Sequence, residues 1–354
     1  MTRAGSPLKI GLMSFAHVHA AGYANLLKSW SGIELLAADP DAATAPPGEL
    51  RGARLAEQLG VGLVDDYDDL FAWGPDAVVV CAETSRHRPL VEQAAARGIH
   101  VLCEKPLATG LPDARAMIEA CARAGVQLMT AYPVRFHPAF ADLRRRVHSG
   151  ALGRVLIANG TNNGRAPISS RRWFVDEELA GGGALMDHTV HLTDLLDDLL
   201  DSPAVEVYAQ VNRIIHADSV EVETGGLVVV TYQDGTVASI DCSWSAPRTY
   251  PAWGGLTLTV EGESASGSFD AFADRFDVFD DAAGGLSWLD YGPDLDALML
   301  GEFLRCVRTG EKCEPDGEVG YRTLQIVRAA YDSVRTGTPV RLGRSVSTGA
   351  APTG

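Results

Sequence analysis

The residue types and spacings that suggest chemistry lie in the segment that follows three glycines at residues 181–183. Leucines recur beyond them with the period of a helix, so Asp187 and His191, four residues apart, are expected on one helical face. A histidine that titrates near neutral pH beside a carboxylate is a usable proton-transfer unit. Bare glycine backbone there would let a ligand or another backbone approach closely. The spacing also fits an ordinary helix start with surface Asp and His side chains.

A lysine at the end of a predicted strand is a second candidate for chemistry. Lys105 follows Cys103 and Glu104 and precedes Pro106, which restricts the lysine backbone to an extended conformation. Its charge could hydrogen-bond a substrate hydroxyl or lower the pKa of that hydroxyl. An ordinary surface lysine at a strand end is the alternative.

The first 131 residues predict elements that would place such side chains together. Apolar strand-like runs at 8–13, 33–38, 77–82, 100–103 and 126–130 alternate with helical patterns at 20–29, 51–59, 89–97 and 112–124. Such alternation is typical of an α/β fold with a Rossmann-type doubly wound parallel sheet. Ligands bind such sheets at the carboxyl ends of the strands. The residues expected to line that crevice are Ser14, Asp39, Thr84, Lys105 and Tyr132.

Residues 132–344 have a different pattern, which predicts a second, α+β domain with a mostly antiparallel open sheet. Strand-like runs separated by turn signals extend from residue 155 to residue 279, and two helical patterns, 294–308 and 318–335, close the domain. The helix that carries Asp187 and His191 belongs to this domain and is expected to face the cleft between the two. The polar tail at residues 345–354 is expected to be disordered.

The turn after the first strand departs from the usual dinucleotide fingerprint. Ser14, Ala16 and His19 stand where Gly-x-Gly-x-x-Gly would place glycines, although Ser14 and Ala16 are small. The following helix still offers free N–H groups to a phosphate, and His17 or His19 could either add a contact or pack against the turn. Asp39 ends the second strand, where an acid binds a ribose 2′-hydroxyl and disfavours a 2′-phosphate, so NAD is preferred over NADP.

Composition excludes several classes of protein. The formal net charge of −16 over 354 residues repels phosphate backbones, so no nucleic-acid partner is expected. No apolar run is long enough to span a membrane, and the N-terminus lacks the features of a signal peptide. The six cysteines are scattered without a Cys-x-x-Cys pair, which favours reduced thiols and a cytoplasmic location.

Two separated motifs together resemble the glucose–fructose oxidoreductase / inositol dehydrogenase family (Gfo/Idh/MocA). They are Glu104-Lys105-Pro106 and the run Gly-Gly-Gly-Ala-Leu-x-Asp-x-x-x-His at residues 181–191. Shorter similarities lie at residues 84–87, 135–138, 150–153 and 331–340, so the resemblance spans nearly the whole chain. The glycine-poor turn is the departure from the family pattern.

The resemblance implies NAD- or NADP-dependent oxidation of a secondary alcohol, or reduction of a ketone, on a sugar, inositol or related polyol. It implies catalytic roles for three residues: His191 as general acid or base, Asp187 to orient or polarise the site, and Lys105 to stabilise negative charge on oxygen. It also implies a homodimer or homotetramer that associates through the second sheet. The expected cofactor contacts are Ser14, Phe15, Ala16, His17, Asp39, Thr84, His87, Glu104 and Lys105. The expected substrate contacts are Tyr132, Arg135, Arg165, Trp173 and His188.

Two alternatives remain open at this stage. Asp187, His188 and His191 could bind a metal with help from His17 or His19, although a lysine beside a cation is unfavourable, and no metal is expected. The chain could instead be a non-catalytic nucleotide- or sugar-binding regulatory protein of the same fold. The missing glycines favour that alternative, and the three intact catalytic-type residues oppose it.

Overall fold

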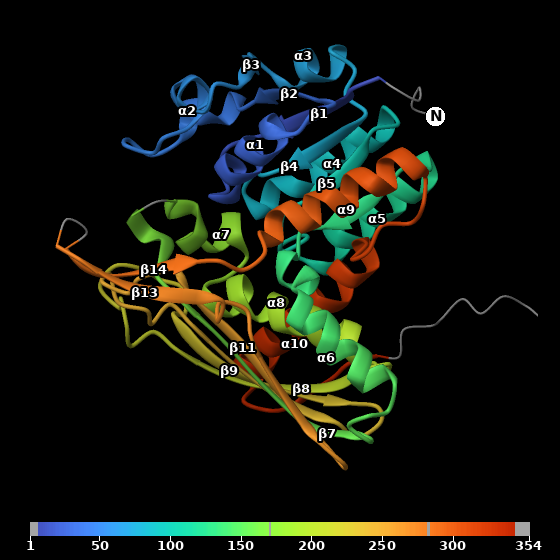
Figure 1. The fold of residues 1–354 in the computed structure, drawn as a ribbon, viewed down its shortest axis with the longest axis vertical. Helices are drawn as coiled ribbons and strands as arrows, with labels where there is room; N and C mark the ends of the chain where they lie inside the picture. The colour runs from blue at the N-terminus through green and yellow to red at the C-terminus, as the bar shows by residue number, and fades with distance from the viewer. Residues whose placement is uncertain (1–5, 170, 282–283, 344–354) are drawn as a thin grey trace, which may run out of the picture.

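The computed structural model describes residues 6–169, 171–281 and 284–343, and an open parallel sheet forms its first half (Figure 1). The strand order is β3-β2-β1-β4-β5-β6, and every neighbouring pair is parallel. This order confirms the predicted Rossmann-type sheet. The strands are β1 (Leu8–Met13), β2 (Ile33–Ala38), β3 (Gly62–Val64), β4 (Ala77–Val80), β5 (His100–Cys103) and β6 (Leu128–Thr130). The helices of this half are α1 (His19–Ser29), α2 (Gly52–Leu59), α3 (Tyr67–Ala72), α4 (His87–Ala96) and α5 (Leu111–Ala124).

Local sequence explains most of these elements. The four apolar residues of β4 are all buried, as a strand covered by helices on both faces requires. Helices α2 and α5 end at Gly60 and Gly125, which adopt the left-handed conformation of a helix C-terminus. The strand β3 was not predicted, because three residues are too few to show a period.

The second half contains a seven-stranded sheet, drawn at the bottom of Figure 1. Its order is β12-β11-β7-β10-β9-β8-β15, and only β7 and β10 pair in parallel, which confirms the mostly antiparallel prediction. The strands are β7 (Val155–Gly164), β8 (Ala204–Asn212), β9 (Gly225–Tyr232), β10 (Val237–Ser243), β11 (Gly254–Gly262), β12 (Ser266–Asp270) and β15 (Val340–Arg341). A separate two-stranded ribbon consists of β13 (Arg275–Asp280) and β14 (Gly285–Asp290).

The helix α8 (Ala184–Leu199) positions the candidate site. It lies between the second sheet and α10 (Gly317–Thr336), beside α6 (Pro138–His148), and most of its side chains are buried (Figure 1). Its N-terminal end faces the parallel sheet, so residues of the first turns lie between the two halves.

The helix α9 (Leu295–Thr309) differs from the sequence expectation. The sequence pattern assigned both C-terminal helices to the second half of the chain. In the structure, Met299 and Phe303 of α9 join the buried cluster that contains Ile10 and Tyr23 of the parallel-sheet half. The helical period identifies an apolar face but not the surface that covers it. The domain boundary after residue 131 therefore stays a prediction.

The described residues contain no helix that combines the length and apolarity needed to cross a membrane. The predicted disordered tail, residues 345–354, lies outside the described residues.

Candidate active site

Three glycines before α8 allow a second backbone to pack against the start of the helix. A Cβ on Gly183 would lie 2.1 Å from the carbonyl oxygen of Glu223, and one on Gly182 would lie 1.8 Å from the hydroxyl of Tyr331. The Glu223 carboxylate accepts hydrogen bonds from the Gly183 and Leu185 N–H groups at 2.9 and 3.0 Å. The close approach of Glu223 and Tyr331, rather than of a ligand, therefore explains why glycines are needed at positions 182 and 183.

The Asp187 carboxylate is the centre of a buried polar network. Lys105 donates from Nζ to Asp187 Oδ1 at 2.7 Å, and Trp244 donates from Nε1 to Oδ2 at 3.1 Å. His188 Nε2 lies 3.2 Å from the same Oδ2. Burial alone would raise the pKa of Asp187, but the charges of Lys105 and His188 outweigh it and hold that pKa well below its usual value. Asp187 is therefore an anion that fixes Lys105 at the end of β5.

His191 lies one turn further along α8 than Asp187 and also lines the cleft. It is 7% exposed, and among the described residues its buried Nδ1 has no hydrogen-bond partner. Burial, reinforced by the positive charge of Lys105, lowers the pKa of His191 well below 6.5, so the ring is neutral at pH 7. In the described part of the chain the Asp187 carboxylate contacts Lys105, Trp244 and His188, so it is not paired with His191 as the four-residue spacing suggested.

These side chains open into one large cleft between the two halves of the chain, with a volume of about 1350 Å³. The sequence analysis named several of its lining residues: His17, Lys105, Arg165, Asp187, His188 and His191. The arrangement offers a neutral base, a lysine donor and an anion that holds the lysine. Those groups can move a proton to or from a hydroxyl and stabilise charge on its oxygen.

The glycine-poor turn after β1 keeps a glycine-like backbone. Ser14 has φ 71°, and its hydroxyl accepts a hydrogen bond from the Ala16 N–H at 3.1 Å. A serine in this left-handed conformation carries strain that a glycine would not. Ser14 therefore adopts the left-handed backbone conformation that a glycine of the fingerprint would adopt without strain.

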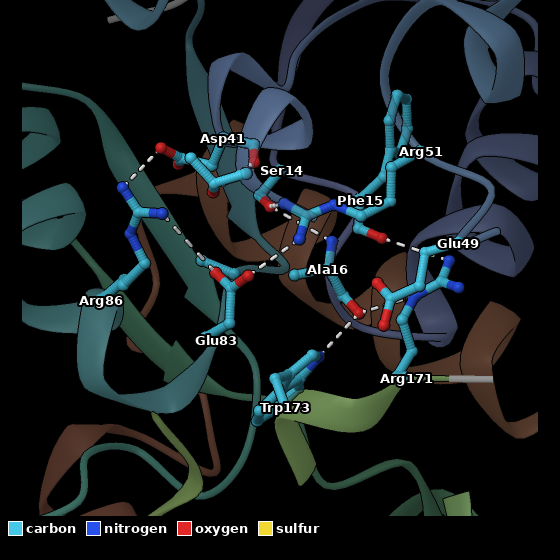
Figure 2. Close-up of polar contacts among 12 residues, drawn as sticks. Ser14, Phe15, Ala16, Asp41, Glu49, Arg51, Glu83, Arg86, Arg171 and Trp173 are labelled. Carbon is cyan, nitrogen blue, oxygen red and sulfur yellow. Dashed lines mark hydrogen bonds and ion pairs between the residues drawn. The ribbon is translucent and has the colours of Figure 1, made fainter. Parts of the chain in front are cut away.

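Arg51 fills the space above this turn, as Figure 2 shows. Its Nη2 lies 2.8 Å from Asp39 Oδ1 and 3.1 Å from Ser14 Oγ, and its Nη1 lies 2.8 Å from Glu83 Oε1. The Gly52 N–H also donates to Asp39, so the four lone pairs of that carboxylate are occupied. A ribose hydroxyl can reach Asp39 only if Arg51 moves.

The segment around Trp173 covers the same turn from the second half of the chain (Figure 2). Arg171 Nε and Trp173 Nε1 each donate to the Ala16 carbonyl at 2.9 Å. Trp173 is buried and stacks on Phe174 with ring centres 3.9 Å apart. Trp173 thus contacts the turn after β1 and is not among the residues that line the cleft, and its role as a substrate contact stays a prediction.

Two further residues predicted as substrate contacts, Tyr132 and Arg135, are held by other side chains, and their contact with substrate stays a prediction. Tyr132 is buried, and its hydroxyl hydrogen-bonds to Thr323 at 2.7 Å. Arg135 is buried against Asp194, with Nη2 2.6 Å from Oδ1. Neither side chain lines the cleft, because both point from the end of β6 into the interface between helices.

Among the predicted cofactor contacts, His87 and Glu104 are buried supports. The His87 ring lies within hydrogen-bond distance of the carbonyls of Pro106 and Leu107, so it holds the loop after Lys105. Glu104 is fully buried and hydrogen-bonds to His19 Nδ1 at 3.0 Å. Neither side chain faces the cleft.

The group of residues whose geometry could hold a metal ion differs from the group named from the sequence, which was Asp187, His188 and His191. His17, His19 and Glu104 each place a ligand atom within 4.8 Å of the others. In the group suggested by sequence, Lys105 already occupies Asp187, so a cation there would face a lysine. The hydrogen bond between His19 and Glu104 explains the new group without an ion.

Unpartnered polar atoms near the strand ends are consistent with a bound dinucleotide. Seven buried side-chain polar atoms in the described part of the chain lack a hydrogen-bond partner, and four of them lie after the ends of β1 and β4 or on α8 beside the cleft. Such atoms are costly unless a ligand or water satisfies them. The four are His17 Nε2, Glu83 Oε2, Thr84 Oγ1 and His191 Nδ1.

Several site residues escaped the sequence analysis. Arg51 donates to Asp39 and Glu83, Trp244 donates to Asp187, and Trp253 and Arg248 line the cleft. None belongs to a motif, because partners more than ten residues away leave no local pattern. Gly254, which follows Trp253, was the one available signal of close packing, since an added Cβ there would lie 2.3 Å from the carbonyl oxygen of Asn163.

Comparison with known families and proteins agrees with this geometry. A model of the NAD-binding Rossmann fold of the oxidoreductase family GFO/IDH/MocA matches residues 10–132, and a model of a GFO/IDH/MocA C-terminal domain matches residues 140–267. The D-xylose 1-dehydrogenase (NADP(+)) 2 of Haloferax volcanii is 29% identical over 85% of this chain and 91% of its own. The scyllo-inositol 2-dehydrogenase (NAD(+)) of Bacillus subtilis is 27% identical over 94% of this chain and 95% of its own.

Solved structures share the fold. GenD2 from gentamicin A biosynthesis, in complex with NAD, superposes with a TM-score of 0.84 at 22% identity over 97% of this chain and 98% of its own. Levoglucosan dehydrogenase, in complex with NADH and levoglucosan, superposes with a TM-score of 0.80 at 20% identity over 96% of this chain and 100% of its own. The chain therefore belongs to the Gfo/Idh/MocA family of NAD(P)-dependent oxidoreductases.

Proposed function

We propose that the protein transfers hydride between NAD(P) and a secondary alcohol or ketone of a sugar, inositol or related polyol, with His191 as general acid or base. One observation carries the proposal: Lys105, held by Asp187 at 2.7 Å, and the neutral His191 line the same cleft. The names of the relatives support the substrate class, since they act on xylose and scyllo-inositol.

The chain's own residues perform the proton chemistry. In the oxidation direction the neutral His191 accepts the hydroxyl proton of the substrate, and in reduction it returns that proton. Lys105 donates a hydrogen bond to the same oxygen and stabilises the charge that develops there. Asp187 holds the Lys105 ammonium in place through the 2.7 Å contact. When bound, the nicotinamide supplies the hydride acceptor or donor.

The cofactor would be held above the turn at Ser14, Phe15 and Ala16. We propose NAD over NADP, because Asp39 ends β2, where an acid binds a ribose 2′-hydroxyl and disfavours a 2′-phosphate. Arg51 pairs with this carboxylate in the structure. A contact between the ribose and Asp39 requires Arg51 to release Asp39.

We also propose a cytoplasmic homodimer or homotetramer that associates through the second sheet. Ile157, Leu227 and Val237 are exposed on β7, β9 and β10. Exposed apolar side chains on adjacent strands favour association. All six cysteines are free and buried, as expected for a reducing compartment.

The test begins with NADH and NADPH titrated into the purified protein by calorimetry, followed by turnover of a panel of polyols and keto-sugars. His191→Ala should lower turnover by about 10²- to 10⁴-fold and leave NADH binding unchanged. His148→Ala, an exposed histidine on α6, is the matched control and should retain full activity. Unchanged turnover in His191→Ala would remove His191 from the mechanism.

The same experiment separates the alternatives. A regulatory protein would bind nucleotide or sugar and turn over nothing. A metal-dependent enzyme would lose activity when a chelator is added and regain it with the metal.

A further inference from the structure

An exposed tryptophan forms one wall of the cleft beyond the reaction centre. Trp253 is 42% exposed although it is large and aromatic, and it lines the cleft. One side of its ring system packs flat on Gly164, where an added Cβ would lie 2.9 Å from the ring. The ring is also nearly parallel to His188, with an interplanar angle of 16° and ring centres 5.6 Å apart. The ring is therefore held rigidly while part of it remains open to the cleft.

This aromatic ring is connected to the catalytic residues through direct contacts. His188, against which Trp253 stacks, lies 3.2 Å from Asp187, and Asp187 holds Lys105. The path from Trp253 to the lysine thus passes through only two side chains. A sugar ring against Trp253 would lie beside the group that must contact the reacting oxygen. Aromatic faces pack well against the apolar C–H faces of sugars.

Two arginines flank this aromatic wall. The Arg165 N–H donates to the Trp253 carbonyl at 2.7 Å, and Arg165 forms an isolated bridge with Ser245. Arg248 lies three residues after Ser245 and lines the cleft as well. Both arginines are exposed, and across the described residues neither makes an ion pair.

Four carboxylates also line the cleft: Asp274, Asp290, Asp294 and Asp296. Among the described residues none of them forms an ion pair with Arg165 or Arg248. The positive charge near Trp253 is therefore not cancelled by a direct contact. Guanidinium groups recognise carboxylate and phosphate through paired hydrogen bonds.

We propose that Trp253, Arg165 and Arg248 form a substrate subsite that selects a sugar carrying an anionic group, a carboxylate or a phosphate. The inference rests on the proposed function and names the substrate class of the same site. The volume agrees with it, because about 1350 Å³ exceeds the range of about 300–1000 Å³ typical of small-ligand pockets. The cleft has room for the reacting ring, the nicotinamide and a charged substituent.

The test compares matched sugars that differ only in charge. Glucose, galactose and mannose are titrated against their uronates and 6-phosphates by calorimetry, with the intact protein saturated with NADH. At least one anionic sugar should bind about tenfold or more tightly than its neutral counterpart, and the difference should shrink as salt increases. The uronate and 6-phosphate arms decide between carboxylate and phosphate.

Variants tie the preference to the named residues. Arg165→Gln/Arg248→Gln should remove the tenfold preference by weakening anionic sugars more than neutral ones, and Trp253→Leu should weaken both kinds of sugar to a similar extent. Arg54→Gln, an exposed arginine on α2, is the control and should keep the preference. Equal affinity for charged and neutral sugars, binding of no anionic sugar, or a preference that survives the double variant would overturn the proposal. Loss of NADH binding or of all turnover would instead refute the proposed function.

Discussion

Replacing Arg51 by leucine should destabilise the protein far more than replacing an exposed arginine nearby. The Arg51 guanidinium is buried and lies 2.8 Å from both Asp39 and Glu83. Leucine leaves the buried Asp39 without its cation and Glu83 with only Arg86 at 4.0 Å, and breaking a buried ion pair costs about 3–5 kcal/mol. At about 2–4 °C per kcal/mol for a domain of this size, the melting temperature of the parallel-sheet half should fall by about 6–20 °C.

The control for Arg51→Leu is Arg86→Leu, which removes an exposed partner of Asp41. The Arg86 side chain is 39% exposed, so its loss should cost about 0–1 kcal/mol. Urea unfolding followed by circular dichroism, with calorimetry of both variants, measures the difference. Equal stability of the two variants would refute the electrostatic argument. Arg51→Leu/Glu83→Gln should recover part of the loss, and no recovery would mean that packing, not charge, was lost.

Three further predictions concern the site. Burial lowers the pKa of both His87 and His191 in the folded state, so the unfolded chain binds more protons below about pH 6.5. The contribution of these two groups to the free energy of unfolding should therefore fall from pH 7 to pH 5, and urea unfolding of His87→Gln should show a weaker pH dependence than the wild type. Lys105→Met should lower kcat by about 10²- to 10³-fold. Since Lys105 helps to lower the pKa of His191, Lys105→Met should also move the acid limb of alcohol oxidation to higher pH, and a pH profile with an unmoved limb contradicts this. Gly183→Ala places a Cβ 2.1 Å from the Glu223 carbonyl and should cost about 1–3 kcal/mol, whereas thermal unfolding of Gly255→Ala, with open space around it, should match the wild type.

Local pattern was enough to predict the two sheets and the core of the site. Buried strands that alternate with helices form a parallel sheet with helices on both faces. The carboxyl ends of these strands lie at the same edge of the sheet, independently of the loop sequences. Lys105, at the end of β5, and the helix of Asp187 and His191 are therefore in one cleft. Spacing also placed His191 on the same side of α8 as Asp187.

Only the tertiary structure decided the partners of these residues. The four-residue spacing suggested an Asp187–His191 pair, but Lys105, His188 and Trp244 take the carboxylate and leave His191 neutral and free. Asp39 lies at the end of the second strand, as expected. Its carboxylate nevertheless accepts a hydrogen bond from Arg51, which lies in the loop before α2, and sequence periodicity does not predict the path of a loop.

The sequence by itself determined which elements form and which residue types end each strand, because periodicity and turn chemistry act over a few residues. The tertiary structure decided that Trp173 contacts the turn after β1, that Trp253 lines the cleft, and that α9 packs into the buried cluster of the parallel-sheet half. Each of these depends on a surface contributed by a segment far away in the chain. A local pattern states that a side chain will be buried or exposed, and only the folded chain supplies the atoms that it contacts.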